Sequence, residues 1–144
     1  MRHDRPMEPI NWLAVILSAN LAVAIGFVWY GPLFGGAAMF GRMAGQHVET
    51  RGKGPVSGML GAILLQALSA LMLAHAFARI GGATLAVKPW LYWMQAGGIA
   101  LAFIGPALFI SYARHRLPMR EALVDAGFWL VVYLATGTVF WALT

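Results

Sequence analysis

The stretch from Ile10 to Phe34 reads INWLAVILSANLAVAIGFVWYGPLF and decides the fold. It contains no Asp, Glu, Lys or Arg. A helix that crosses the hydrocarbon core of a bilayer needs about 20 apolar residues. Arg2 and Arg5 precede the stretch, as in a signal peptide, but the apolar run continues well past the small-residue site at Ala22-Val23-Ala24. The stretch therefore predicts a retained transmembrane helix.

Three further apolar windows follow, and each is bounded by charge or by Gly and Pro. The predicted helices cover about 10–34, 56–78, 89–113 and 121–143. The longest connection is 35–55, whereas residues 81–88 form a tight turn and residues 114–120 a short basic one. Short connections make neighbouring helices antiparallel. The sequence therefore predicts an all-α protein, a single membrane domain over residues 1–144 built as an up-down bundle of four transmembrane helices.

Composition supports the bilayer as solvent. Hydrophobic residues make up 60% of the chain and charged residues 10%, whereas soluble domains carry about 25% charged residues. The chain has no cysteine, which excludes disulfides and thiolate metal sites. Its net charge of +5 lies in loops and ends rather than in a basic stripe. We therefore expect contact with lipid and no nucleic-acid binding.

Basic residues set the expected orientation. Four flank the side that carries both termini, and six flank the other side. The first group is Arg2, Arg5, Arg79 and Lys88, and the second is Arg42, Arg51, Lys53, Arg114, Arg116 and Arg120. The positive-inside rule places the richer side in the cytoplasm, so both termini are predicted to be periplasmic. Aromatic residues mark both membrane interfaces: Trp12, Trp90, Trp93 and Trp141 at the terminal side, and Trp29, Tyr30 and Tyr112 at the other.

Small residues recur at four-residue steps and predict close helix packing, because lipid supplies no hydrophobic drive for helix association. The predicted packing residues are Ala14, Ser18, Ala22, Gly26, Gly58, Ala62, Gly98 and Ala102. The pattern leaves open whether they contact helices of the same chain or of a partner. Gly105-Pro106 predicts a kink in the third helix. Gly31-Pro32 resembles it at the end of the first helix, but the two matches are too short to predict a duplication.

Four polar side chains are expected inside the membrane: Asn20, Gln66, Gln95 and Asp125. Asn20 and Gln66 share a depth, so we expect them to bond each other, since an unpaired amide in hydrocarbon is costly. The alternative is a polar step in a substrate or ion path. Asp125 lies one turn into the last helix. It is expected to pair with Arg114, Arg116 or Arg120, and alternatively to accept a proton or a cation.

Enzymatic chemistry is not indicated. The sequence offers no nucleophile constellation, phosphate loop or dinucleotide fingerprint, so no catalytic residue is assigned. His75 has no second ligand at metal-binding spacing, and we expect no metal and no cofactor.

The segment Trp29-Tyr30-Gly31-Pro32-Leu33-Phe34-Gly35, with Asn11-Trp12-Leu13-Ala14-Val15 before it, resembles the opening of a bacterial membrane family, domain of unknown function 1761. The layout of four spans is similar as well. The chain departs from the family pattern in two places. Gly36-Ala37-Ala38 stands where members carry a Lys-Ala-Trp-like step, and Asp125-Ala126-Gly127-Phe128-Trp129 stands where they carry a segment like Asn-Ala-Gly-Tyr-His. The resemblance implies a bacterial inner-membrane location and supplies no activity.

Together these features favour a non-catalytic accessory or structural subunit that packs against a membrane-protein partner or forms a homo-oligomer. The alternative is a small oligomeric transporter or channel for a small solute, proton or cation. It would use the four intramembrane polar side chains.

Overall fold

The computed structural model of the chain describes residues 8–34 and 55–144, with side chains of the second span described from Leu60 onward. Throughout this described part the regular structure is helical, without a strand. The predicted all-α fold is therefore confirmed. The predicted packing residue Gly58 lies outside the described side chains, and the positive charges of residues 42–53 lie outside the described residues.

The first span consists of α1 (Trp12–Val28) and a π-helical turn, η1 (Trp29–Leu33). Asn11 caps α1, because its side-chain oxygen accepts a hydrogen bond of 3.0 Å from the Ala14 amide. η1 contains Pro32, which lacks an amide hydrogen. A wider turn moves the carbonyl of the preceding turn away from the proline ring, although Pro32 still donates no hydrogen bond.

The second span is α3 (Pro55–Ile80), which is followed by α4 (Gly82–Val87). Gly81 separates them with a φ of +87°, a conformation that favours glycine. The predicted tight turn at 81–88 is therefore wrong in detail, since this connection folds a short helix. The Glu8 carboxylate accepts a hydrogen bond of 2.8 Å from the Gly82 amide and ties the N-terminal segment to it.

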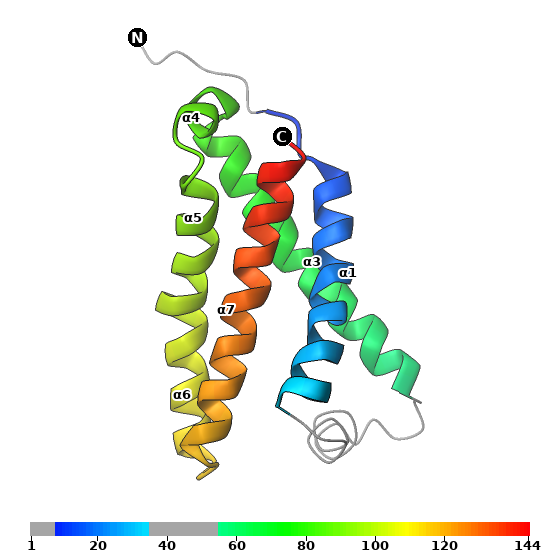
Figure 1. Cartoon of the computed structure of the whole chain (residues 1–144), viewed down its shortest axis with the longest axis vertical. Helices are drawn as coiled ribbons and strands as arrows, with labels where there is room; N and C mark the ends of the chain where they lie inside the picture. Colours follow the sequence, from blue (N-terminus) through cyan, green and yellow to red (C-terminus); the bar gives the residue numbers. More distant parts are fainter. Residues whose placement is uncertain (1–7, 35–54) are drawn as a thin grey trace.

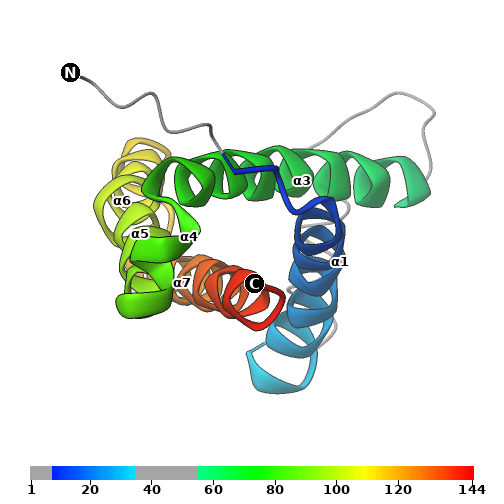
Figure 2. The same cartoon turned by 90° about the horizontal axis from the view of Figure 1, so that it is seen from above.

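The third span is built from α5 (Leu91–Ile99), the π-helical turn η2 (Ala100–Ile104) and α6 (Gly105–Arg114). The fourth is α7 (Met119–Ala142), which starts after Pro118. In Figure 2, α7 lies between α1 and the α5–α6 column, and α3 runs along the side opposite α7. Figure 1 shows that α3 is tilted relative to the other spans. Figure 1 shows that Thr144 and the start of α1 lie at the same end.

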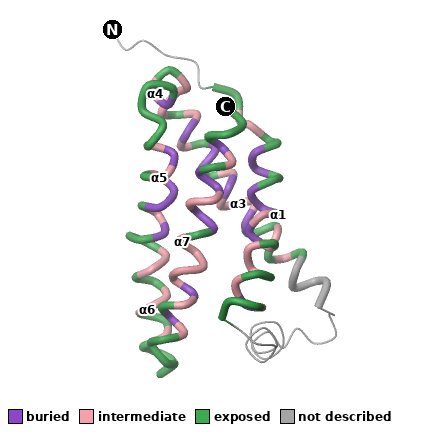
Figure 3. The backbone as a smooth tube through the Cα atoms, viewed as in Figure 1, coloured by how far each residue is buried: buried purple, intermediate pink, exposed green. Residues whose placement is uncertain are grey.

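Aromatic packing closes that end of the bundle. The centroid of the Phe77 ring lies 4.8 Å from the centroid of the Tyr92 ring and 5.2 Å from that of the Phe140 ring. The helices α3, α5 and α7 therefore meet at this end. Buried residues follow the inward faces of the helices, and the ends are largely exposed (Figure 3).

The described residues contain four helical stretches that are long and apolar enough to cross a membrane: Trp12–Leu33, Leu60–Ile80, Leu91–Arg114 and Met119–Ala142. Only 22–33% of each is buried inside the chain. Most of their apolar surface therefore faces outward, as lipid contact requires.

Candidate functional site

A carboxylate lies buried where three spans meet. Asp125 of α7 is 5% exposed. The Tyr30 hydroxyl, from η1, donates a hydrogen bond of 2.7 Å to Oδ1, and the Tyr112 hydroxyl, from α6, donates one to Oδ2. Each carboxylate oxygen therefore has its own donor from a different helix.

Packing around Gly127 brings these groups together. The Trp29 indole Nε1 donates a hydrogen bond of 3.2 Å to the Val124 carbonyl oxygen. A Cβ at Gly127 would lie 3.1 Å from the Trp29 ring, so glycine permits this close approach. The centroids of the Phe128 and Tyr30 rings lie 5.0 Å apart. The indole thus fixes the first span against α7 one residue before the tyrosine that binds Asp125.

This geometry corrects two expectations. Asp125 was expected to pair with Arg114, Arg116 or Arg120, but tyrosines bind it instead. All three arginines are exposed, and in the described part of the chain no ion pair engages them. Tyr30 was expected in an interfacial aromatic belt, but it is buried, 5% exposed, and faces the carboxylate. A hydroxyl that faces hydrocarbon has no hydrogen-bond partner. The inward orientation, in which Tyr30 donates to Asp125, is therefore more stable than one that faces lipid.

The expected pair of midplane amides is also wrong. Asn20 is exposed on α1, and its Nδ2 donates a hydrogen bond of 2.8 Å to the carbonyl oxygen of Ile16 in the preceding turn. Gln66 is buried, 5% exposed, on α3. Asn20 therefore faces outward and Gln66 inward, so the two amides do not bond each other. Gln95 is half-buried on α5 and joins neither.

The packing stripe of the first span lies where it was predicted. Ala14, Ser18 and Ala22 are buried, and the Phe128 ring lies 3.7 Å from the position of a Cβ on Gly26. Ser18 Oγ is buried without a hydrogen-bond partner among the described residues. This face therefore packs within the chain.

The other predicted packing residues that the structure describes do not pack within the chain, although Ala70 and Ala74, two and three four-residue steps after Ala62, are buried in α3. Ala62, Gly98 and Ala102 are exposed. In the third span the buried small residues are instead Ala96 and Gly97 of α5 and Ala100 of η2, which lie on the opposite face. Among the described glycines, Gly137 allows the closest approach of two spans, since a Cβ there would lie 2.9 Å from the Tyr92 carbonyl oxygen. Small residues occur on several faces of the same helix, and all of these faces are apolar. The sequence therefore did not show which face is buried.

At the predicted kink, the five π-helical residues of η2 end directly before Gly105-Pro106. Proline clashes with the carbonyl one turn earlier, and a π-helical turn displaces that carbonyl. The Ala100 carbonyl oxygen lies 3.5 Å from the position of a Cβ on Gly105.

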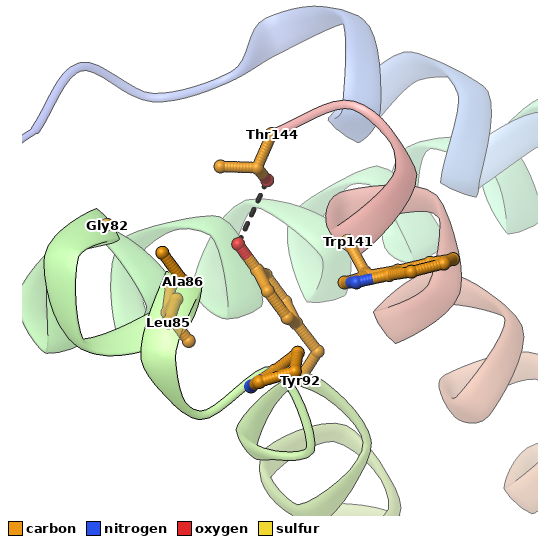
Figure 4. Close-up of a pocket in the computed structure, with 7 residues that line it drawn as sticks. Gly82, Leu85, Ala86, Tyr92, Trp141 and Thr144 are labelled. Carbon is orange, nitrogen blue, oxygen red and sulfur yellow. Dashed lines mark hydrogen bonds between the residues drawn. The ribbon is translucent and has the colours of Figure 1, made fainter.

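A pocket of about 440 Å³ lies at the terminal end, lined by Gly82, Leu85, Ala86, Pro89, Tyr92, Trp141 and Thr144. Within it the Tyr92 hydroxyl donates a hydrogen bond of 2.9 Å to Thr144 Oγ1 (Figure 4). None of its lining side chains is a carboxylate or an imidazole. Among the described residues no three His, Asp or Glu side chains gather as metal ligands, and His75 is exposed.

The four spans define a multi-pass membrane protein whose first, third and last spans meet at one buried carboxylate. The chain belongs to the family described as Protein of unknown function (DUF1761), whose model matches residues 13–141. The resemblance seen in the sequence is thereby confirmed. No curated protein and no solved structure matches the chain.

The two segments that carried the family comparison touch each other. Trp29 and Tyr30 belong to the Trp-Tyr-Gly-Pro motif, whereas Asp125, Gly127 and Phe128 belong to the segment that departs from the family pattern. Their contacts form the site described above. A change in the second segment is therefore a change in the surroundings of the first.

Proposed function

We propose that this chain is a non-catalytic subunit that assembles with other transmembrane helices, from a partner protein or from a second copy. The observation that carries the proposal is the position of Asn20. Its amide lies near the middle of the first span and is exposed on the outer face of α1.

The amide of Asn20 is incompletely satisfied within the described chain. Its hydrogen bond to Ile16 uses one N–H, and Oδ1 and the second N–H have no partner among the described residues. Transferring an unpaired amide group from water into hydrocarbon costs several kcal/mol. A hydrogen bond between two transmembrane helices stabilises their association by only about 0.6–2 kcal/mol. A polar side chain from another helix would satisfy it.

Exposed small residues support the same reading. Ala24 lies one turn after Asn20 on the outer face of α1, and Gly98 and Ala102 form an outward small pair on the third span. Nothing in the described chain lies within 4 Å of a Cβ built on Gly98. Such faces let another backbone approach closely.

Cross-linking tests the proposal, since the chain has no native cysteine. Ala24→Cys, on the Asn20 face, is expected to form an intermolecular cross-link in native membranes. Leu64→Cys, which is 70% exposed in the second span and away from both of these faces, is the control and should form none. Asn20→Leu in the Ala24→Cys background should weaken the adduct. A chain that stays monomeric and uncross-linked in native membranes would contradict the proposal.

A second candidate function rests on Asp125. An ionisable residue inside a span is by default a candidate for an ion or proton pathway. The second proposal is therefore a small transporter or channel for a proton, cation or small solute. Flux in proteoliposomes that appears with the parent chain and disappears with Asp125→Asn would favour it over the subunit.

The proposed location is the bacterial inner membrane with both termini in the periplasm. The family resemblance supports the first part and the excess of basic residues at the first and third connections supports the second.

A further inference from the structure

Three arginines crowd the connection between the third and fourth spans. Arg114 ends α6, Arg116 lies in the connection and Arg120 lies in the first turn of α7. We call residues 114–120 the arginine turn. All three side chains are exposed, and because tyrosines bind Asp125, no described carboxylate neutralises them. Glu121 follows directly but forms no ion pair with them in the described chain.

The backbone of the arginine turn is well defined. The Leu117 amide donates to the Tyr112 carbonyl oxygen at 2.9 Å, and the Arg116 amide donates to that of Ala113 at 3.2 Å. Arg116 has a φ of +54°. These are the hydrogen bonds of a Schellman motif, in which the left-handed position is usually glycine. The turn itself does not need the side chain of Arg116, so its guanidinium requires another explanation.

The apolar neighbours place the arginine turn at the membrane surface. Leu117 and Met119 are 43% and 48% exposed and stand between the arginines in sequence. Exposed apolar side chains interleaved with arginines suit a layer where acyl chains meet phosphates. The start of α7, which has no side-chain cap, adds a positive partial charge at the same place.

We infer that the arginine turn binds the phosphate of an anionic phospholipid headgroup. Guanidinium groups bind phosphate through paired hydrogen bonds, and the three here have no competing carboxylate in the described chain. A lipid is favoured over a soluble phosphate because Leu117 and Met119 would contact its acyl chains. This inference does not depend on the proposed assembly, since the arginine turn is remote in sequence from the Asn20 face.

Native mass spectrometry of the full chain in mild detergent tests the inference, with phosphatidylglycerol and phosphatidylcholine as probes. The parent is expected to bind phosphatidylglycerol more tightly. Removing one arginine should weaken that binding about fivefold, and Arg114→Gln/Arg116→Gln/Arg120→Gln should weaken it on the order of a hundredfold. Phosphatidylcholine binding should not change.

Two controls keep the test decisive. Arg116→Gly suits the left-handed backbone, so it should fold at least as well as the parent and still lose about fivefold in phosphatidylglycerol binding. Arg79→Gln/Lys88→Gln removes two positive charges at the opposite end and should leave this binding unchanged. An equal loss in that double variant, or no loss in the triple variant, overturns the inference. Displacement of phosphatidylglycerol by millimolar inorganic phosphate would show a soluble anion site and would also overturn it.

Discussion

The Tyr30 hydroxyl donates a 2.7 Å hydrogen bond to the carboxylate of Asp125, 95 residues further along the chain. The first span and the last span are thus joined at the end of the bundle opposite the termini. With the Tyr112 donor from the third span, Asp125 connects three of the four spans. Its removal should therefore affect the whole bundle rather than one helix.

Asp125→Leu should lower the free energy of unfolding by about 1–3 kcal/mol, because the buried Tyr30 hydroxyl and the half-buried Tyr112 hydroxyl lose their acceptor. Asp125→Asn should lower it less, since the amide oxygen still accepts one hydrogen bond. Unfolding in mixed micelles of mild and denaturing detergent measures both. Glu121→Leu, one turn earlier on α7, is the control and should change stability little. Equal stability of Asp125→Leu and the parent would show that the tyrosines find other acceptors.

Tyr30 and Asp125 should be energetically coupled. A double-mutant cycle of Tyr30→Phe and Asp125→Leu is expected to give a coupling energy of about 0.5–2 kcal/mol, since either substitution alone breaks the same hydrogen bond. The cycle of Tyr133→Phe with Asp125→Leu serves as the comparison, because no hydrogen bond joins that pair in the described chain. Additive effects for Tyr30 and Asp125 would reject a direct interaction.

Gly137→Ala should destabilise the contact between α5 and α7. The added Cβ would lie 2.9 Å from the Tyr92 carbonyl oxygen, and backbone has to move to relieve that overlap. A loss of about 1–3 kcal/mol is expected from such overpacking. Gly98→Ala is the matched control, because its Cβ meets nothing within 4 Å and alanine favours a helix by about 1 kcal/mol. A thermal melt in which both variants behave alike would contradict the close approach of α5 and α7 at Gly137.

Fusion reporters test the orientation. Alkaline phosphatase fused after Thr144 is expected to be active, because the six basic residues of the first and third connections should hold that side in the cytoplasm. A fluorescent protein that folds only in the cytoplasm, fused at the same point, should stay dark. The opposite pair of results would reverse the topology.

Hydropathy predicted the four spans because each helix that crosses a bilayer needs a long apolar segment, and such segments are easily recognised in the sequence. It did not predict which face of each span is buried, because both lipid and protein interior accept apolar side chains. Gly98 and Ala102 therefore looked as suitable for packing as Ala96 and Ala100, yet only the latter pair is buried. In a soluble bundle the polar face would have resolved this ambiguity.

The sequence does carry one signal for the Asp125 site. Tyr30 lies near the end of the first span, Tyr112 near the end of the third and Asp125 near the start of the fourth, so all three share one depth. Depth alone assigned the tyrosines to an interfacial belt and the carboxylate to the nearby arginines. Which side chains face inward depends on helix rotation, and this in turn depends on contacts such as Trp29 with Gly127.

The contacts between α1 and α7 also constrain the order in which the bundle is assembled during synthesis. Asn11 caps α1 by itself, but its Nδ2 donates to the Leu143 carbonyl oxygen, 132 residues later. Trp29 and Tyr30 likewise find their partners only in the last span. The first helix therefore enters the membrane well before the ribosome has made the residues that complete its polar contacts. Until α7 arrives, these groups must be held by water, lipid headgroups or an insertase.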